Sequence, residues 1–521
     1  MSAAIPGGAG EGLRRDILTT LLPGFAGPAA PEWLLAMLGE GLGGVCLFGT
    51  NVETPAQLAR LAGELRRANP DAVVAIDEEG GDVTRLFFDR GAPYPGNAVL
   101  GRIDDLELTR AVGGAVGEAL AAVGCTMTFA PDADINSNPL NPVIGVRSFG
   151  ASPDLVARHT AAWVEGVQSA GIDAAAKHFP GHGDTATDSH LALPVVDLPL
   201  ERLRERELAP FRAAIAAGTR SIMTSHILLP QLDAEQPATL SSRILHRLLR
   251  GELGFEGVIV SDALDMAGAS GVHGIPEAAV RALAAGCDLL CIGTDNTAPQ
   301  MEDIVESIAE AVAAGRLAVE RVTDAAARVR ALAAGHPAAG GSSDAGPSVG
   351  AGLPGELPAD LGDRIAASFH VADGALARLG GGGRIGTVVR IDTVANIAVG
   401  GVPWGPFALL EEPDPDRPAP AWLAAAPVLA LDAGTPLGDP AGLAGPVLVV
   451  GKDLHRHPFA VEAITRLRAA RPDVVTVDMG WPSDDLALAD VATFGASRSV
   501  AEALASVVDR AVGAASPVEA P

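Results

Sequence analysis

The stretch from Lys177 to His190, KHFPGHGDTATDSH, concentrates side chains that can bind polar ligands and move protons. It holds three histidines, two aspartates, a lysine and two glycines in fourteen residues. It follows the apolar run IDAAA, which predicts a strand. Three interpretations are open for such a stretch: a polar loop whose side chains cap turns, a metal site, or a site of acid–base chemistry.

A metal site would draw its ligands from His178, His182, His190, Asp184 and Asp188. The spacing supports this weakly, because neither the pair His178 and His182 nor the pair Asp188 and His190 lies on an evident helix. In the acid–base interpretation, Asp188 accepts a hydrogen bond from one imidazole nitrogen of His190 and leaves the other nitrogen to transfer a proton.

The stretch resembles the signature of family 3 glycoside hydrolases, specifically of their bacterial β-N-acetylglucosaminidase branch, in which a KHFPGHGxTxxDSH loop carries an Asp-x-His pair as general acid/base. The resemblance covers about residues 15–335 with specific motifs and is only general beyond them. It implies a retaining mechanism through a covalent glycosyl–enzyme. It also implies that no metal and no organic cofactor are needed.

The elements around this stretch alternate between short apolar runs and helical patterns, as an α/β fold requires. The predicted strands are 19–25, 44–48, 72–77, 126–135, 172–179, 221–227, 257–262 and 287–293. Eight strands close a (β/α)8 TIM-type barrel. Helix signals lie between them: Thr54-Pro55 opens one helix, and Pro276 opens another that Gly286 ends.

Polar residues follow these strands where barrel enzymes carry their chemistry, at the carboxyl ends. They are Asp77, Asp134, Lys177, His178, His226 and Asp262. Each could alone form an ion pair or cap a turn. Their convergence on one rim favours an active site.

Cleavage with retention needs a nucleophilic carboxylate and a proton donor. Asp262, in GVIVSDALDM, resembles the nucleophile position of the family, and we expect Asp265 only to cap a turn or face solvent. His190 is the predicted acid/base and Asp188 its orienting partner. An imidazole can give and take a proton near neutral pH without a shifted pKa.

The resemblance also assigns residues that bind the terminal sugar. They are Asp77, which accepts from hydroxyls, and Arg147, Lys177 and His178, which donate to them. His226 and Met223 match the pocket wall, whereas Glu78 and Glu79 support the turn at Gly80-Gly81 in one interpretation. Val146 departs from the pattern, because a polar residue often precedes the arginine of the family.

The chain is long enough for two domains. We expect the barrel over residues 1–335, a flexible linker rich in Gly, Ala and Pro over 336–362, and a smaller αβα-sandwich domain over 363–521. Strands of the second domain are predicted at 387–392, 428–433, 446–451, 474–480 and 491–496. This domain has no Gly-x-Gly-x-x-Gly fingerprint, so a nucleotide site there is unsupported.

The net charge of −27 argues against nucleic acid or an anionic membrane as partner. No run of about 18 apolar residues and no signal peptide is evident, so we expect a cytoplasmic protein. The four cysteines, Cys46, Cys125, Cys287 and Cys291, lie in apolar runs. We expect free buried thiols, which agrees with a reducing compartment.

The sequence therefore predicts a retaining exo-β-N-acetylglucosaminidase that acts on muropeptide or chitooligosaccharide fragments, with a small carbohydrate as its partner. The alternatives are a phosphorylase, a β-glucosidase with relaxed specificity at the 2-position, an inactive sugar-binding protein and a metal-dependent hydrolase. Inorganic phosphate is an alternative acceptor, because a histidine base places no fixed negative charge beside it.

Overall fold

The structure is a computed structural model, and it describes residues 7–186, 193–271, 273–336, 357–380, 384–411 and 419–513. Its contacts divide the chain into two compact units. The first comprises Met1–Glu79, Leu106–Pro142 and Ala151–Glu356, and the second comprises Gly80–Asp105, Val143–Gly150 and Leu357–Pro521. Two segments inside the predicted barrel, 80–105 and 143–150, therefore group with the second unit.

The first unit is built on short parallel strands. They are β1 (Leu21–Pro23), β2 (Gly44–Leu47), β3 (Val73–Ile76), β4 (Met127–Thr128), β5 (Asp173–Phe179), β6 (Ser221–Thr224), β7 (Val258–Val260) and β8 (Leu290–Gly293). The strands from β2 to β7 pair in chain order, and β1 pairs with β8. An isolated bridge between Val260 and Leu289 joins β7 to the start of β8. The result is a curled parallel sheet.

One hydrophobic core takes side chains from all eight strands. Its members include Leu22, Cys46, Val73, Met127, Ala175, Met223, Val258 and Cys291, each almost fully buried. A single cluster can collect side chains from all eight strands only if the sheet curls around it, as in the interior of a barrel. All four cysteines are free and buried, which confirms that prediction.

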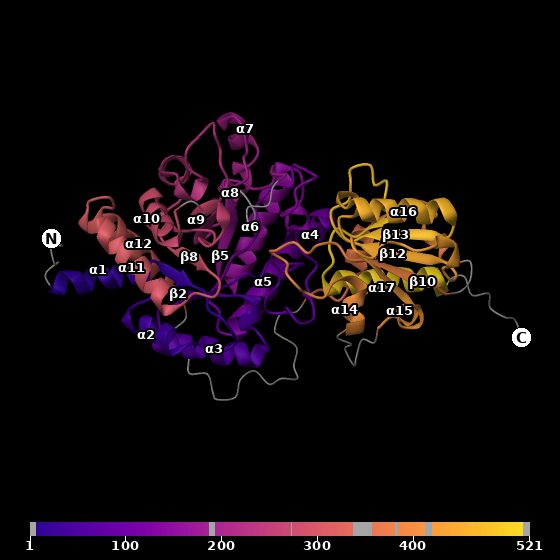
Figure 1. Ribbon diagram of the computed structural model, residues 1–521, viewed down its shortest axis with the longest axis horizontal. Coiled ribbons are helices and arrows are strands. Elements are labelled where there is room, and N and C mark those ends of the chain that lie inside the picture. Colours follow the sequence, from indigo (N-terminus) through magenta and orange to yellow (C-terminus); the bar gives the residue numbers. More distant parts are fainter. Residues whose placement is uncertain are drawn as a thin grey trace, which may run out of the picture. The chain divides into compact units, whose positions relative to one another are not determined.

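Helices cover the outside of this curled sheet (Figure 1). They are α1 (Gly7–Thr19), α2 (Glu32–Glu40), α3 (Pro55–Ala68), α5 (Leu106–Ala122), α6 (Pro153–Ser169), α7 (Leu200–Glu205), α8 (Leu208–Ala216), α9 (Ala267–Ser270), α10 (Ile275–Ala285), α11 (Ala298–Ala313) and α12 (Val319–Ala333), with a π-helix at Arg243–Glu252. The predicted signals hold at two ends: Thr54 accepts a hydrogen bond from the backbone of Gln57, and Gly286 ends α10.

Several predicted strands are longer than the observed ones, and the difference is largest at 126–135. The predicted strand 126–135 is regular only over β4, because Pro131 has no N–H to donate to a ladder. Beyond it, Asp132 pairs with Lys177 through an isolated bridge. This irregular backbone carries Asp132 and Asp134 alongside β5, so its loss of regular pairing matters for the site described below.

The second unit has a sheet in the order β11-β10-β12-β13-β14-β9, parallel except at β9. Its strands are β9 (His370–Val371), β10 (Thr387–Ile391), β11 (Val428–Leu431), β12 (Val447–Gly451), β13 (Val474–Asp478) and β14 (Val491–Ala492). Its helices are α4 (Asn97–Ile103), α13 (Leu361–Ser368), α14 (Gly405–Glu411), α15 (Ala421–Ala425), α16 (Pro458–Ala470) and α17 (Arg498–Gly513). Figure 1 shows α16 on one face of this sheet and α14 and α17 on the other.

The first and last residues of the predicted linker belong to the described parts of the two units. His336 is buried in the first unit, where its Nε2 lies 2.6 Å from Asp173, and α13 begins at Leu361, before the predicted end of the linker. Residues 337–356 lie outside the described residues.

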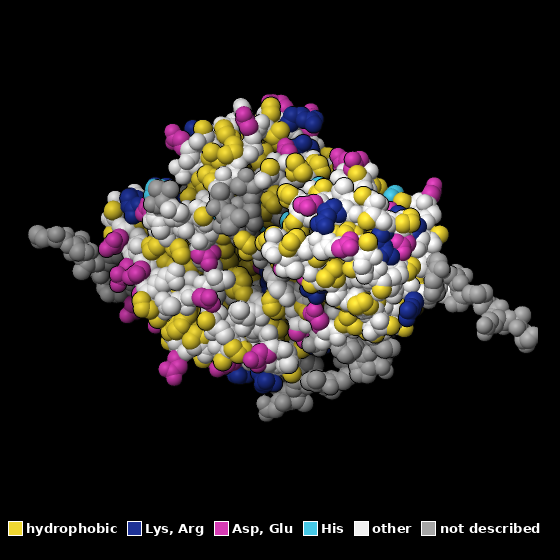
Figure 2. All heavy atoms as spheres, turned by 45° about the vertical axis from the view of Figure 1, so that its right-hand side comes forward, with side chains coloured by type: hydrophobic (Ala, Val, Ile, Leu, Met, Phe, Trp, Pro, Cys, Tyr) yellow, Lys and Arg dark blue, Asp and Glu magenta, His cyan; other side chains and the backbone are white. Residues whose placement is uncertain are grey.

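The described part of the chain contains no helix that is long and apolar enough to cross a membrane. Figure 2 shows one face of the molecule, on which Asp and Glu side chains are scattered among Lys and Arg, and its described residues form no broad basic patch.

Candidate active site

The polar residues of the first unit lie at one end of its sheet. Asp77 follows β3 directly, Lys177 and His178 lie in the second half of β5, and Asp262 comes two residues after β7. Because these strands are parallel and neighbouring, their carboxyl ends meet at the same edge. We call this edge the rim.

Lys177 is the centre of the first charged group on the rim. Its Nζ lies 2.7 Å from Asp77 Oδ1 and 2.7 Å from Glu79 Oε1. The side chains of Lys177 and Glu79 are only 3% exposed, but that of Asp77 is 20% exposed. Two carboxylates share one ammonium, so the group keeps an excess of acceptor oxygens. Asp77 is the member that solvent or a sugar hydroxyl can reach.

Asp134 is the centre of the second group and is fully buried. Its Oδ2 lies 2.7 Å from His178 Nδ1, and its Oδ1 accepts from the backbone N–H of His182 at 2.6 Å. Burial pushes the pKa of Asp134 upward, but the charge and hydrogen bond of His178, together with His182, bring it below its usual value. An ionised carboxylate can only accept, so His178 Nδ1 is the donor and the ring orientation is fixed.

Asp132, Asp134 and His178 also have ligand atoms within 4.8 Å of one another, close enough to hold a metal ion. In the structure, the nitrogen that would bind the metal instead donates to Asp134. The other predicted ligands with described positions, Asp184 and His182, do not join this group: Asp184 pairs with Arg206, and His182 Nδ1 lies 3.0 Å from Thr185 Oγ1. The geometry therefore matches a hydrogen-bonded network better than a set of metal ligands.

Asp262 is half-buried and is held by its own turn. Its backbone N–H donates to Thr224 Oγ1 at 3.3 Å, and its Oδ1 accepts from the N–H of Ala263 at 2.8 Å. These two hydrogen bonds fix the carboxylate at the end of β7. Asp265 instead accepts from the backbone and hydroxyl of Thr294, which confirms its predicted role as a cap.

His182 lies within the electrostatic reach of Asp262, a relation that the sequence did not reveal. Burial lowers its pKa to about 4, although the charges of Asp134 and Asp262 act in the opposite direction. The ring is therefore neutral at neutral pH. Its Nε2 is buried and has no hydrogen-bond partner among the described residues.

Met223 lies in β6 and His226 follows this strand by two residues. Their contacts differ from those of the charged groups around Lys177 and Asp134. His226 is buried, with Nδ1 2.9 Å from Thr239 Oγ1 and Nε2 2.9 Å from the carbonyl oxygen of Ala263. It thus supports the turn that presents Asp262. Met223 is packed in the hydrophobic core of the barrel. A role for either residue at the pocket wall stays a prediction.

Three predicted residues cannot be placed on this rim. Asp188 and His190 lie outside the described residues. Arg147 belongs to the second unit, where it is buried and its carbonyl oxygen accepts from Asn97 Nδ2 at 2.7 Å. The roles of all three stay predictions.

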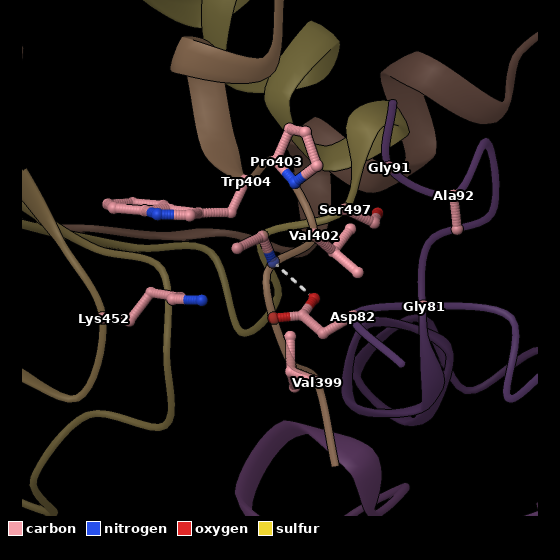
Figure 3. A pocket seen from close by; sticks show the side chains of 11 residues that line it. Gly81, Asp82, Gly91, Ala92, Val399, Val402, Pro403, Trp404, Lys452 and Ser497 are labelled. Atoms are coloured by element: carbon pink, nitrogen blue, oxygen red, sulfur yellow. Dashed lines mark hydrogen bonds between the residues drawn. The ribbon is translucent and has the colours of Figure 1, made fainter. Parts of the chain in front are cut away.

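The second unit has a small pocket of its own, with roughly 200 Å³ of empty space (Figure 3). Its narrow part accepts no more than a water-sized group. Figure 3 shows Lys452 and Asp82 pointing toward each other beside Trp404, and Asp82 accepts from the backbone N–H of Ala496 at 2.8 Å. Lys452 directly follows β12, next to the point between β10 and β12 where the strand order reverses.

Comparison with known proteins decides the family. Residues 30–332 match the model of the glycosyl hydrolase family 3 N terminal domain. The chain belongs to this family. By family it is a glycoside hydrolase, as the signature around Lys177 predicted.

Two named relatives indicate which kind of enzyme the chain resembles in sequence: both are beta-hexosaminidases. Beta-hexosaminidase A of Pseudoalteromonas piscicida is 38% identical over 317 residues, which are 56% of this chain and 53% of that protein, so the match spans about half of the relative. A beta-hexosaminidase of Pseudomonas aeruginosa (strain LESB58) is also 38% identical, over 50% of this chain and 77% of the relative.

Solved structures extend the likeness over both units. A glycoside hydrolase family 3 beta-N-acetylglucosaminidase from Paenibacillus sp. str. FPU-7 has a TM-score of 0.83 and 32% identity, covering 95% of this chain and 96% of its own. NagZ from Neisseria gonorrhoeae, solved in complex with N-trifluoroacetyl-D-glucosamine, has a TM-score of 0.52 and 33% identity, covering 60% and 89%. A beta-glucoside phosphorylase shares the fold at 17% identity and a TM-score of 0.76, with coverage of 98% and 94%.

Proposed function

We propose that this chain is a retaining exo-β-N-acetylglucosaminidase that releases terminal N-acetylglucosamine from muropeptide or chitooligosaccharide fragments in the cytoplasm. The proposal includes a complete (β/α)8 barrel and an αβα-sandwich second domain. The observation that carries it is the rim of a family 3 chain, where Asp262 ends β7 and Lys177 is paired with Asp77 and Glu79. The names of the relatives support the choice of sugar.

In the proposed mechanism, Asp262 attacks the anomeric carbon and forms the glycosyl–enzyme, while His190 gives a proton to the leaving oxygen. Asp188 orients the imidazole. His190 then takes a proton from the incoming water, which releases the sugar with retained configuration. The hydrogen bond to Thr224 fixes the backbone of Asp262, and the N–H of Ala263, which donates to Oδ1, restrains rotation of the carboxylate.

Sugar binding is assigned to the residues that surround Asp262. Asp77 accepts from sugar hydroxyls, because it is the exposed carboxylate of its group, and Lys177 and His178 donate to them. Arg147 is assigned as a further donor on the resemblance alone, and His226 and Met223 are assigned to the wall. No step requires a metal or an organic cofactor.

A comparison of aryl glycosides tests this proposal. We expect the 4-nitrophenyl β-glycoside of N-acetylglucosamine to be cleaved at least about 100-fold more efficiently than the β-glucoside, since a site that bonds the acetamido group rejects an analogue without it. NMR of the first product should show the β-anomer. No cleavage of the first substrate, or an α-anomer, would contradict the proposal.

The same assay separates hydrolysis from phosphorolysis, the alternative for which a histidine base is suited. Inorganic phosphate is raised to tens of millimolar and the products are identified. Free sugar alone, at an unchanged rate, is the outcome for a hydrolase. Formation of the sugar 1-phosphate would make the chain a phosphorylase.

Replacement of His190 by Ala tests the acid/base assignment. The His190→Ala variant should lose far more rate on substrates with poor leaving groups than on activated aryl glycosides, because only the former need a proton in the first step. An equal loss on both classes would show that His190 is not the general acid.

A further inference from the structure

Arg206 and Glu207 connect α7 to α8 and lie behind the segment from Gly181 to Thr185, which we call the support loop. Arg206 Nη2 donates to Asp184 Oδ2 at 2.6 Å, and its Nε donates to Glu207 Oε1 at 2.5 Å. One guanidinium thus joins an aspartate of the support loop to a glutamate of the scaffold. The side chain of Glu207 is 1% exposed and that of Arg206 is 20% exposed.

Glu207 also contacts the support loop directly. Gly181 has φ +127°, and a Cβ on it would lie 2.8 Å from Glu207 Cβ and 3.0 Å from Glu207 Oε2. The backbone at Gly181 therefore packs against this side chain, with no room for a larger residue. Only glycine combines this backbone conformation with such a close approach.

The remaining carboxylate oxygen of Glu207 is not explained by the fold. Oε2 is buried and makes no hydrogen bond within the described ranges. Burial raises the pKa of Glu207 to about 7, against the effect of Arg206, and the charges of Asp134 and Asp184 raise it further. A buried carboxyl with one unsatisfied oxygen is unfavourable for stability, so a purely structural purpose is a poor explanation for it.

The support loop leads directly, in sequence, to the residues of the proposed acid–base chemistry. Asp188 lies four residues beyond Asp184. The described part of this loop is held by Asp134, which accepts from the N–H of His182, and by Asn141, whose Nδ2 donates to the carbonyl oxygens of His182 and Gly183. The connection between α7 and α8 adds two further anchors, the ion pair of Arg206 with Asp184 and the contact of Glu207 with Gly181.

We propose that Arg206 and Glu207 are positioning residues for the general acid/base, because they fix the support loop from which Asp188 and His190 continue. This inference rests on the proposed function, since it assigns those two positions their roles. Neither residue of the pair acts on substrate.

Activity with two classes of leaving group tests the pair. Glu207→Ala and Arg206→Lys should lower kcat about 10- to 100-fold on substrates with poor leaving groups, and only a few-fold on activated aryl glycosides, because a displaced acid fails only where a proton is needed. Glu207→Gln retains an oxygen for Arg206 and should recover most of the rate. Glu205→Gln is the matched control, since it removes an exposed carboxylate two residues away and should change neither rate.

Hydrogen exchange gives a readout that does not depend on the reaction. Peptides that cover residues 181–186 should exchange faster in Glu207→Ala than in the wild-type protein, while peptides of β3 and β7 exchange as before. Faster exchange throughout the first unit would show that the pair only stabilises the fold, and that would overturn the inference.

The two proposals fail in distinguishable ways. If the wild-type protein does not cleave N-acetylglucosaminides, the proposed function fails, whatever the exchange results. If it cleaves them, and Glu207→Ala slows both classes of substrate equally with unchanged exchange at 181–186, only the positioning role is wrong.

Discussion

The two units place acidic residues at the carboxyl ends of parallel strands, but they satisfy these residues differently. On the rim of the first unit, the carboxylates of Asp77 and Asp134 accept from the side chains of Lys177 and His178. At the corresponding edge of the second unit, Asp478 is the last residue of β13, and its carboxylate accepts, within the described residues, only from backbone N–H groups, those of Asp453, Leu454 and Gly480.

This difference separates a site from a scaffold. Side-chain donors can shift between a carboxylate and a ligand hydroxyl, whereas backbone donors are fixed by the chain, so the carboxylate that they satisfy serves the turn. Asp82, which accepts from the N–H of Ala496 beside a water-sized pocket, belongs with Asp478. The strand order of the second unit indicates where such sheets bind ligands, but the side chains there are committed to the fold.

The largest effect is expected when the aspartate at a strand end in each unit is replaced, and unlike outcomes in the two units would support the distinction between them. Asp262→Asn should reduce kcat by about 10⁴-fold with an unchanged Tm, because it removes the nucleophile and keeps the shape. Asp478→Asn should change Tm, because it replaces a buried carboxyl that serves only the fold, but it should leave the activity per folded molecule unchanged. Kinetics and thermal unfolding of both variants check this, and a catalytic defect in Asp478→Asn would contradict it.

Lys177 provides the second test. Lys177→Met leaves Asp77 and Glu79 without their shared ammonium, and removing one partner of a buried ion pair destabilises by about 3–5 kcal/mol. We also expect a loss in kcat/KM, since a donor to the sugar is gone. Urea unfolding and initial rates measure the two effects. An exposed pair gives the control: Arg204→Met breaks the contact with Glu252 and should leave the unfolding free energy nearly unchanged.

The pH dependence of stability tests the scaffold carboxylate. Burial, together with the charge of Asp453, raises the pKa of Asp478 from its ordinary value of 3.8 to about 7. The folded form binds the proton more tightly than the unfolded form, so the protonated carboxyl of Asp478 adds to the free energy of unfolding. This contribution, up to about 4 kcal/mol, is complete below pH 3.8 and is lost as the pH rises toward 7. Asp478→Asn should flatten the dependence of unfolding free energy on pH across this window. An equal slope in both proteins would exclude Asp478 as its source.

The smallest effect is expected at Asp82. Asp82→Asn keeps an oxygen for the N–H of Ala496 and replaces a half-buried carboxyl group beside Lys452, so we expect a change in unfolding free energy within about 1 kcal/mol. The value of kcat should be unchanged. A marked change in the kinetics would mean that the pocket in Figure 3 takes part in the reaction.

Sequence reasoning reached the strands and the rim because both depend on local patterns. Apolar runs marked every strand except β9, whose residues His370 and Val371 lie in no apolar run, and polar residues directly after the strands marked the rim, as Asp77 and Asp262 illustrate. It could not find the relation between His182 and Asp262, since they are 80 positions apart and meet only through the curled sheet. The burial of Glu207 could not be predicted for the same reason. It results from the contact with Gly181 in another loop, and the residues next to Glu207 in the sequence form no pattern that indicates a buried carboxyl.

The composition of the second unit has a consequence for the order in which the chain can fold. Residues 80–105 and 143–150 are synthesised early, but the other members of their unit begin only at Leu357. Those two segments must remain without their native neighbours while more than two hundred further residues leave the ribosome. Apolar side chains such as Val83 and Ala98, which are buried in clusters with C-terminal residues, stay exposed during this interval. The vulnerable period of biosynthesis therefore ends only with the last helix, and a chain cut after the linker would retain that vulnerability permanently.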